Sequence, residues 1–372
     1  MPPFTPGLQL SECFYREAAR PILDGSFPDL PHAAALLGHG SEVLGFDTAR
    51  STDHEWGPRL LLLLAEEDAR RHAAAIGDLL AQRLPPEFLG YSTHFGPADD
   101  EGVSLPAAAP DGPINHKIVV TTVPAFIEDR LGVTTYPTVD LLDWLVCSEK
   151  GLLEVTGGAV FHDGPGALTA AREAFRYYPD DLWRYLLAAQ WRRVSQQEAF
   201  VGRCGEVGDE LGSALVAAAL VRDLMRLCFL LERRYAPYAK WLGSAFARLA
   251  CADELGPFLD GALAARSWHE RERQLGGAYA VVAASHNRLG LSDPLPTAVS
   301  PYHGRPFLVI HGDRFADAIR ARIRDPRVLA LPPDVGSVDQ FVDATDVLSY
   351  PERRRRLKAV YDWEGPEPLA SA

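Results

Sequence analysis

The sequence predicts an α+β protein in which an amino-terminal domain of strands and helices is followed by a mainly helical domain. Strand-like and helix-like patterns alternate up to about residue 165, and helical periodicity dominates from Leu168 onward. A chain of 372 residues suits two domains, and its 47% hydrophobic content is ample for two cores. We expect one domain over 1–165, a helical domain over 166–292, and a small α/β extension over 293–372 packed on the others.

The first part of the amino-terminal domain reads as a helix, a loop, a strand and a second helix. Apolar residues recur at four-residue intervals over 8–24, which predicts an amphipathic helix with Ser11 as its cap. The leucines of 60–64 predict a buried strand, and Gly57-Pro58 before them predicts a bulge or an edge position. Residues 68–84 have one apolar face and end at prolines, which fits a crossover helix.

The second part of this domain begins with a loop that is rich in Pro, Gly and Ala, over 96–113. The β-branched run at 116–123 predicts a strand, and helices are expected near 124–131 and 138–147. In LLEVTGGAVFHD, at 152–163, a Gly-Gly pair between apolar runs predicts a hairpin.

The helical domain is expected to form around its longest helix, at 209–234, which is apolar almost all round and should be a buried spine. Asp209 is the predicted cap of this helix. Beyond Pro294, the runs RPFLVIHGD and RVLALPPDVGSVDQ predict two short strands around a helix at 314–324.

Composition excludes several classes of protein. The formal charge of −13 disfavours nonspecific nucleic-acid binding, which depends on Lys and Arg, and favours small or cationic partners. No apolar run approaches the length that spans a bilayer and no secretory signal pattern is present, so we expect a cytoplasmic protein without a membrane partner. Five widely spaced cysteines predict neither a disulfide framework nor a zinc site. The oligomeric state is left open.

The most informative motif is GHGSEVLGFDTARSTDHEWG, at residues 38–57. Gly40 and Ser41 can place a tight turn, backbone N–H groups and a hydroxyl against a triphosphate. Asp53 and Glu55 would leave the same face of an extended strand and jointly hold Mg²⁺ or Mn²⁺. With a metal on the α-phosphate, the protein has only to orient a hydroxyl and neutralise charge as pyrophosphate leaves. The motif therefore predicts nucleotidyl transfer.

On these residues the chain resembles the nucleotidyltransferase superfamily that includes DNA polymerase β and kanamycin nucleotidyltransferase. The matching residues are Gly40-Ser41 and Asp53-His54-Glu55. Together with them, GDELGS at 208–213 and YAPYAKWLGSAF at 235–246 resemble an uncharacterised bacterial family placed in that superfamily. The resemblance implies a nucleotidyltransferase-like α/β domain with a mixed sheet, followed by the helical domain. It also implies transfer of a nucleoside monophosphate from ATP, or another nucleoside triphosphate, to a hydroxyl of a small, aminoglycoside-like molecule.

Further candidate residues accompany the motif. Arg50 precedes the acids and can meet phosphate or base, and Asp47 or Glu42 can reach a metal if the loop curls back, although Asp47 also reads as a solvated turn residue. By analogy with aminoglycoside-modifying enzymes, Lys240 would contact the triphosphate, although it also fits a lysine that packs beside aromatic residues. Glu210 would be the general base for the acceptor, with Asp223 and Glu232 as alternatives.

One part of the superfamily pattern is missing. Most members carry a third carboxylate on a later strand, but the strand HKIVVTTV holds no acid. This absence keeps open a nucleotide-binding or regulatory module that has lost catalysis. A nucleotidyltransferase that modifies a protein is the third possibility.

Overall fold

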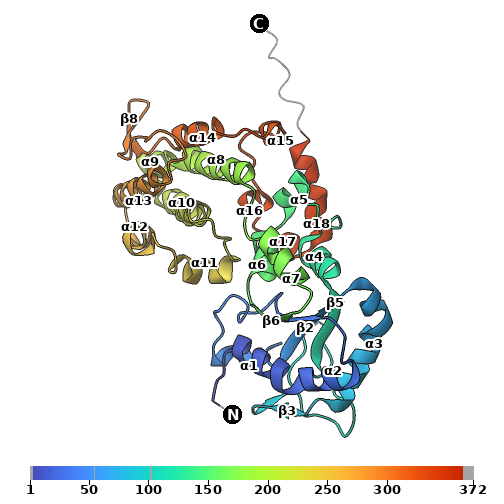
Figure 1. Ribbon diagram of the computed structural model, residues 1–372. Coiled ribbons are helices and arrows are strands. Elements are labelled where there is room, and N and C mark those ends of the chain that lie inside the picture. Colours follow the sequence, from blue (N-terminus) through green and yellow to red (C-terminus); the bar gives the residue numbers. More distant parts are fainter. Residues whose placement is uncertain (1–2, 54, 101–102, 363–372) are drawn as a thin grey trace. The chain divides into compact units, whose positions relative to one another are not determined.

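The protein has two compact units (Figure 1) in a computed structural model that describes residues 3–53, 55–100 and 103–362. The first unit comprises Met1–Val139 and Gly151–Arg176, and the second comprises Asp140–Lys150 and Tyr177–Ala372. The chain forms many helices and a sheet with both parallel and antiparallel strands, so the predicted α+β class is confirmed. The sequence suggested domain boundaries at 165 and 292. In the structure, the segment after 292 falls within the second unit.

The first unit is built on a four-stranded sheet with the order β5-β2-β1-β6. Strand β1 runs antiparallel to both of its neighbours, whereas β2 and β5 are parallel, with Arg59 opposite Lys117. The end of β1 therefore lies at the same edge of the sheet as the starts of β2 and β5. The bounds are β1 (Ala33–Leu36), β2 (Arg59–Leu64), β5 (Lys117–Thr122) and β6 (Ala159–Asp163).

Two helical segments supply apolar side chains to a core shared with this sheet. The predicted helix over 8–24 is confirmed as α1 (Gly7–Phe14), a π-helical turn (Tyr15–Ala19) and α2 (Arg20–Ser26). The predicted cap is wrong, because Ser11 lies buried inside α1. The second segment is the crossover helix α3 (Glu66–Arg83), and the core includes Phe14, Leu23, Leu60, Leu62, Leu64, Ile76, Leu80 and Ile118.

The rest of the first unit agrees with the sequence except at the predicted hairpin. The expected helix after β5 is α4 (Val123–Leu131), and α7 (Ala167–Ala174) follows β6. Residues 149–156 form helix α6 (Glu149–Thr156) instead of a hairpin strand, and Leu152 and Val155 are fully buried. Gly157 donates its N–H to the Leu153 carbonyl (2.7 Å), so the Gly-Gly pair ends a helix. The small pair β3 (Glu87–Phe88) and β4 (Tyr91–Ser92) completes the unit.

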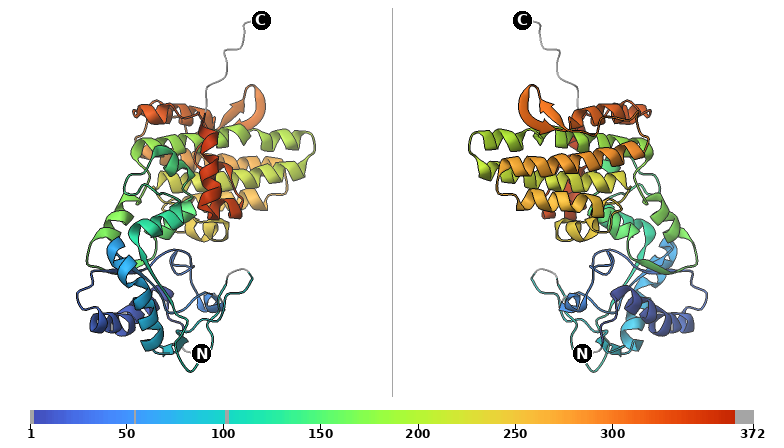
Figure 2. Two further views of the ribbon diagram at one scale, coloured as in Figure 1. Left: turned by 90° about the vertical axis from the view of Figure 1, so that its right-hand side faces the viewer. Right: turned by 90° about the vertical axis from the view of Figure 1, so that its left-hand side faces the viewer.

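The second unit is a stack of helices (Figure 2) with α10 (Glu210–Leu231) at its centre. The predicted spine is confirmed, and so is its cap, because the Asp209 carboxylate accepts the Gly212 N–H at 2.7 Å. Helix α10 packs against four others, and α14 lies along α8. The four helices packed on α10 are α8 (Asp180–Gln197), α9 (Phe200–Glu206), α12 (Ala252–Ala264) and α13 (Trp268–Arg288), and α14 spans Gly312–Arg320.

The carboxyl-terminal part joins this helical unit. One predicted strand is confirmed as β8 (Arg305–Val309), paired with β7 (Ser300–Tyr302). The second is wrong, because its residues form the short helices α15 (Pro326–Leu329) and α16 (Val338–Phe341). Side-chain caps at Asp325 and Ser337 start these helices. The remaining elements are α5 (Leu141–Val146), α11 (Ala239–Phe246), α17 (Thr345–Ser349), α18 (Pro351–Arg356) and a 3₁₀ turn (Leu357–Tyr361).

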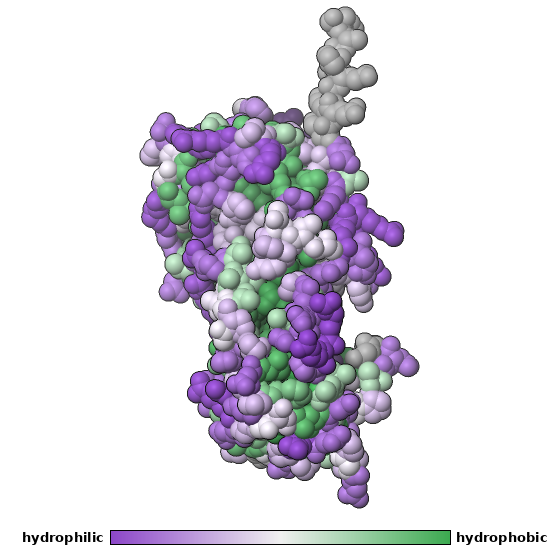
Figure 3. All heavy atoms as spheres, turned by 45° about the vertical axis from the view of Figure 1, so that its right-hand side comes forward, coloured by the Kyte–Doolittle hydropathy of each residue, from purple (hydrophilic) through white to green (hydrophobic). Residues whose placement is uncertain are grey.

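Hydrophilic residues cover much of the face drawn in Figure 3, with apolar residues between them. Across the described ranges, each helix is too short or too polar to cross a membrane.

Candidate functional site

The Gly-Ser turn directly follows β1 at the sheet edge where β2 and β5 begin. Gly40 has φ +136°, a backbone region that favours glycine. A Cβ added there would lie 2.6 Å from Glu42 Oε2 and 2.7 Å from Arg59 Nη2. The turn is closed by the Phe46 N–H, which donates to the Ser41 carbonyl at 2.8 Å. Glycine is therefore required at residue 40 by both its conformation and its neighbours.

A buried ion pair between Glu42 and Arg59 holds this turn on the sheet. The side chains are 3% and 9% exposed, and Arg59 Nη2 donates to Glu42 Oε1. The same nitrogen donates to the His39 carbonyl at 2.9 Å, while Nη1 lies 3.2 Å from His39 Nε2. Because Arg59 is the first residue of β2, the strand fixes the turn directly.

The acid-x-acid motif does not lie on a strand, so this expectation was wrong. Asp53 ends a 3₁₀ turn (Ala49–Asp53), and Glu55 has φ +46°, in the left-handed region. Strand β2 begins only at Arg59, after Gly57 at φ +149° and a proline. The 3₁₀ turn and the Gly-Pro break prevent the extended backbone that the motif suggested. The side chain of Asp53 and all of His54 lie outside the described part of the structure.

Glu55 nevertheless reaches the Gly-Ser turn. Its Oε2 lies 3.2 Å from His39 Nε2, and its Oε1 accepts from Lys117 Nζ at 3.4 Å. Glu55 is thus linked to the residue before Gly40 on one side and to the start of β5 on the other. We call the five linked side chains the strand-edge cluster: His39, Glu42, Glu55, Arg59 and Lys117.

His39 is the titratable imidazole of this cluster. Its pKa is lowered by desolvation of the ring and by the nearby charges of Arg59 and Arg130, and the Glu55 and Glu154 carboxylates oppose this shift. Its Nε2 faces an N–H donor of Arg59 and a carboxylate oxygen of Glu55. A neutral imidazole nitrogen either accepts or donates, so one of these two contacts is unsatisfied at any moment. The permanent charges of the cluster are therefore two carboxylates and two cations.

The described members of the predicted metal site already have protein partners. No group of three His, Cys, Asp or Glu side chains that could hold a metal ion is found among the described residues, which leave out the Asp53 side chain and His54. Glu55 already faces Lys117 and His39. The Asp47 carboxylate accepts from the Gly7 N–H (2.7 Å) and from Trp56 Nε1 (3.3 Å), so it anchors the start of α1. The predicted metal pair thus depends on Asp53.

Arg50 is exposed on the 3₁₀ turn before the acids. Its backbone N–H donates to Thr48 Oγ1 at 3.3 Å. The structure thus gives its side chain no part in the strand-edge cluster, and phosphate binding by Arg50 stays a prediction.

Glu210 and Lys240 belong to the second unit. Glu210 Oε2 lies 2.5 Å from Arg271 Nη1, and its Oε1 accepts the Trp268 N–H at 3.2 Å. The hydrogen bond from Arg271 lowers the pKa of Glu210, which makes it a weaker base. Lys240 is exposed at the start of α11, with its Nζ 5.0 Å from the Trp241 ring centre. The roles predicted for these two residues remain predictions.

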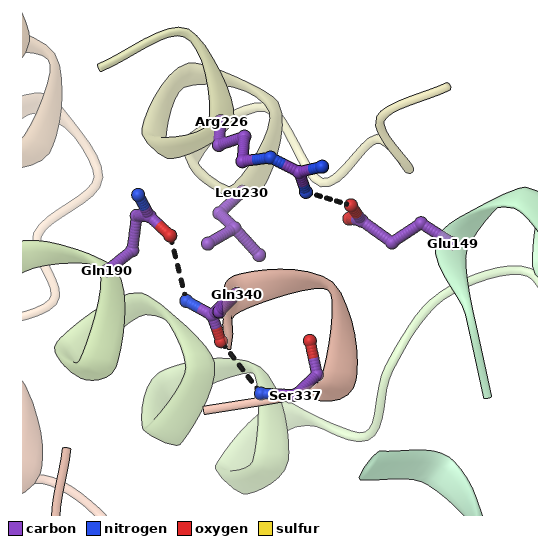
Figure 4. Close-up of a pocket in the computed structure, with 6 residues that line it drawn as sticks. All are labelled: Glu149, Gln190, Arg226, Leu230, Ser337 and Gln340. Atoms are coloured by element: carbon purple, nitrogen blue, oxygen red, sulfur yellow. Dashed lines mark hydrogen bonds and ion pairs between the residues drawn. The ribbon is translucent and has the colours of Figure 1, made fainter. Parts of the chain in front are cut away.

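Sequence reasoning missed a buried polar pocket in the second unit (Figure 4), lined by Glu149, Gln190, Arg226, Leu230, Ser337 and Gln340. Arg226 Nη1 donates to Glu149 Oε2 at 3.1 Å, and Gln340 Nε2 donates to Gln190 Oε1 at 3.0 Å. Burial, followed by the nearby Asp339 charge, raises the pKa of Glu149 to about 8. The cavity of about 10 Å³ has room for one water molecule and cannot hold a nucleotide.

Comparison with known proteins adds little about activity. Residues 144–242 match a family described as a domain of unknown function (DUF4037). This segment runs from α5 into α11 and does not include the strand-edge cluster. No curated protein matches the chain.

Among solved structures, a nucleotidyltransferase-like protein from Exiguobacterium sibiricum 255-15 is similar over 73% of this chain and 76% of its own. The identity is 11% and the TM-score is 0.32. Likeness at that level establishes neither the fold nor the activity, so the function has to be argued from the strand-edge cluster.

Proposed function

We propose that the strand-edge cluster is a nucleotide site, and that the protein transfers a nucleoside monophosphate from ATP or another nucleoside triphosphate to a hydroxyl group, releasing pyrophosphate. The supporting observation is the contact of 3.2 Å between His39 Nε2 and Glu55 Oε2. Ser41 and Asp53 are 12 residues apart in the sequence. A triphosphate site needs the two parts of the motif at one place, and this contact joins them.

The protein groups in this proposal act by position and charge. Backbone N–H groups of the turn at Gly40 and the Ser41 hydroxyl bind phosphate oxygens, because a glycine turn allows close approach. Arg59 keeps the turn in place through Glu42 and the His39 carbonyl. Lys117 neutralises charge on the phosphates. Nucleotidyl transfer requires little else from the protein than alignment of the acceptor and stabilisation of charge.

Mg²⁺ or Mn²⁺ at Asp53 and Glu55 stays a prediction from the sequence. The described side chains supply only Glu55 to such a site, so no step of the proposal passes through a metal. A small-molecule hydroxyl remains the proposed acceptor. Glu210 as its base and Lys240 as a second phosphate contact are the least supported parts.

The test is release of pyrophosphate. The protein is incubated with each of the four common ribonucleoside triphosphates, Mg²⁺ and a panel of hydroxyl compounds that includes aminoglycosides. We expect release above the protein-free level with at least one combination. Asp53→Ala removes a carboxylate predicted to hold Mg²⁺, and Glu55→Gln weakens the link between Lys117 and His39, so each should lower that rate by about 10²-fold or more.

Glu87→Gln is the matched control, because Glu87 is an exposed carboxylate of the same unit, on β3. It should leave the rate unchanged. Nucleotide binding without pyrophosphate release across the panel would instead support the noncatalytic module, which the acid-free β5 favours. Label from ATP that appears on polypeptides of a lysate would indicate a protein acceptor. Absence of nucleotide binding would refute the proposal.

A further inference from the structure

Lys117 occupies a distinctive position at the strand edge. It is the first residue of β5 and lies opposite Arg59 in the parallel register with β2. Side chains of registered residues leave the same face of a sheet, so these two cations are neighbours. Two residues further along β5, on the same face as Lys117, Val119 is 52% exposed, so the described residues leave this face of the strand partly uncovered.

The Lys117 ammonium already performs the electrostatic task of a bound cation. Its Nζ lies 3.4 Å from Glu55 Oε1, and its side chain is 29% exposed. An ammonium has three N–H donors, so one contact with Glu55 leaves donors for phosphate oxygens. The same positive charge disfavours a divalent cation on Glu55, because like charges at such distances repel.

The other charges of the cluster leave Lys117 free to meet an anion. Glu42 is neutralised by Arg59, and the Glu55 carboxylate is 25% exposed, so water can solvate it when Lys117 turns to phosphate. Arg59 Nε is buried and finds no hydrogen-bond partner among the described residues. An incoming anion would therefore meet two cations, Arg59 and Lys117, at one edge of the sheet.

We propose that Lys117 is a built-in cation of the nucleotide site, so that the triphosphate binds without divalent metal. This inference rests on the proposed function and deepens it. Lys117 Nζ exchanges its contact with Glu55 for the phosphate oxygens, and Glu55 is released toward His39.

The test is calorimetric titration of the full chain with ATP, in EDTA and in Mg²⁺. We expect wild-type affinity in EDTA to be within about threefold of that in Mg²⁺. Lys117→Met should weaken binding in EDTA by about tenfold or more, as loss of a hydrogen bond to a charged group does. Lys117→Arg, which keeps the charge, should retain most of the affinity.

Arg83→Met is the control, because Arg83 is exposed at the end of α3 and its loss removes one positive charge from the same unit. It should bind ATP as the wild type does. Wild-type binding that appears only with Mg²⁺ would overturn this inference and leave the proposed function intact. Unchanged ATP affinity of Lys117→Met in EDTA would also overturn this inference and leave the proposed function intact. If the wild type bound no ATP in either buffer, both the proposed function and the role of Lys117 would be rejected. The wild-type comparison of EDTA with Mg²⁺ tests the inference even if Lys117→Met does not fold.

Discussion

Replacing Arg59 with methionine is expected to lower the free energy of unfolding of the first unit by about 3–5 kcal/mol, the typical cost of breaking a buried ion pair from one side. Glu42, 3% exposed, would then keep a buried charge without its partner. Arg59 also donates to the His39 carbonyl, so the turn at Gly40 would lose its second link to β2. Hydrogen exchange of β2 amides at increasing urea concentrations measures the change locally.

Two variants bracket this result. The double variant Glu42→Gln with Arg59→Met removes both charges and should recover much of the lost stability. Arg71→Met breaks an exposed ion pair, in which Arg71 is 62% and Glu67 is 73% exposed. It should change the free energy of unfolding little. If Arg59→Met destabilised β2 no more than Arg71→Met does, the buried pair would not be what holds the turn.

Gly40→Ala is expected to weaken ATP binding by about tenfold or more, because a displaced turn loses hydrogen bonds to a charged phosphate. The new Cβ would lie 2.6 Å from Glu42 Oε2 and 2.7 Å from Arg59 Nη2, so the turn or the ion pair has to move. The backbone at φ +136° adds strain of about 1–3 kcal/mol. Titration with ATP, together with a thermal melt, separates the loss of binding from the loss of stability.

Gly112→Ala is the matched control for backbone strain. Gly112 has φ +147°, and a Cβ there meets nothing within 4 Å. Gly112 lies in the loop over 96–113 and not in the strand-edge cluster. The Gly112→Ala variant should therefore bear similar backbone strain and bind ATP as tightly as the wild type. Equal loss of affinity in both variants would show that strain alone, and not the position of Gly40, controls binding.

Local signals in the sequence were enough to predict most elements. The spine helix α10 was predictable because Asp209 caps a long apolar run, and β2 and β5 because leucines and β-branched residues form short runs between breaks. The predicted hairpin was wrong because a Gly-Gly pair ends a helix and turns a hairpin equally well, and burial of Leu152 and Val155 decides between them. A sequence pattern that fits both a helix end and a hairpin turn can be assigned only from its tertiary contacts.

The candidate site was predictable in its residues but not in its arrangement. Gly40, Ser41 and Glu55 were singled out from the motif, yet the expected strand at the acids is absent because Glu55 takes a left-handed conformation before Gly57. Arg59 and Lys117 were not predicted as site residues. Their roles depend on register between two strands that are far apart in the sequence, which no local pattern encodes.

Hydrogen exchange measured by mass spectrometry, with and without saturating ATP, tests the central claim most directly. Nucleotide binding at the strand-edge cluster predicts slower exchange in the turn over residues 37–46 and at the start of β5. It predicts no comparable protection around the small pocket beside Glu149, which cannot hold a nucleotide. Protection confined to the second unit, or unchanged exchange throughout the first unit at saturating ATP, would contradict the assignment of the nucleotide site.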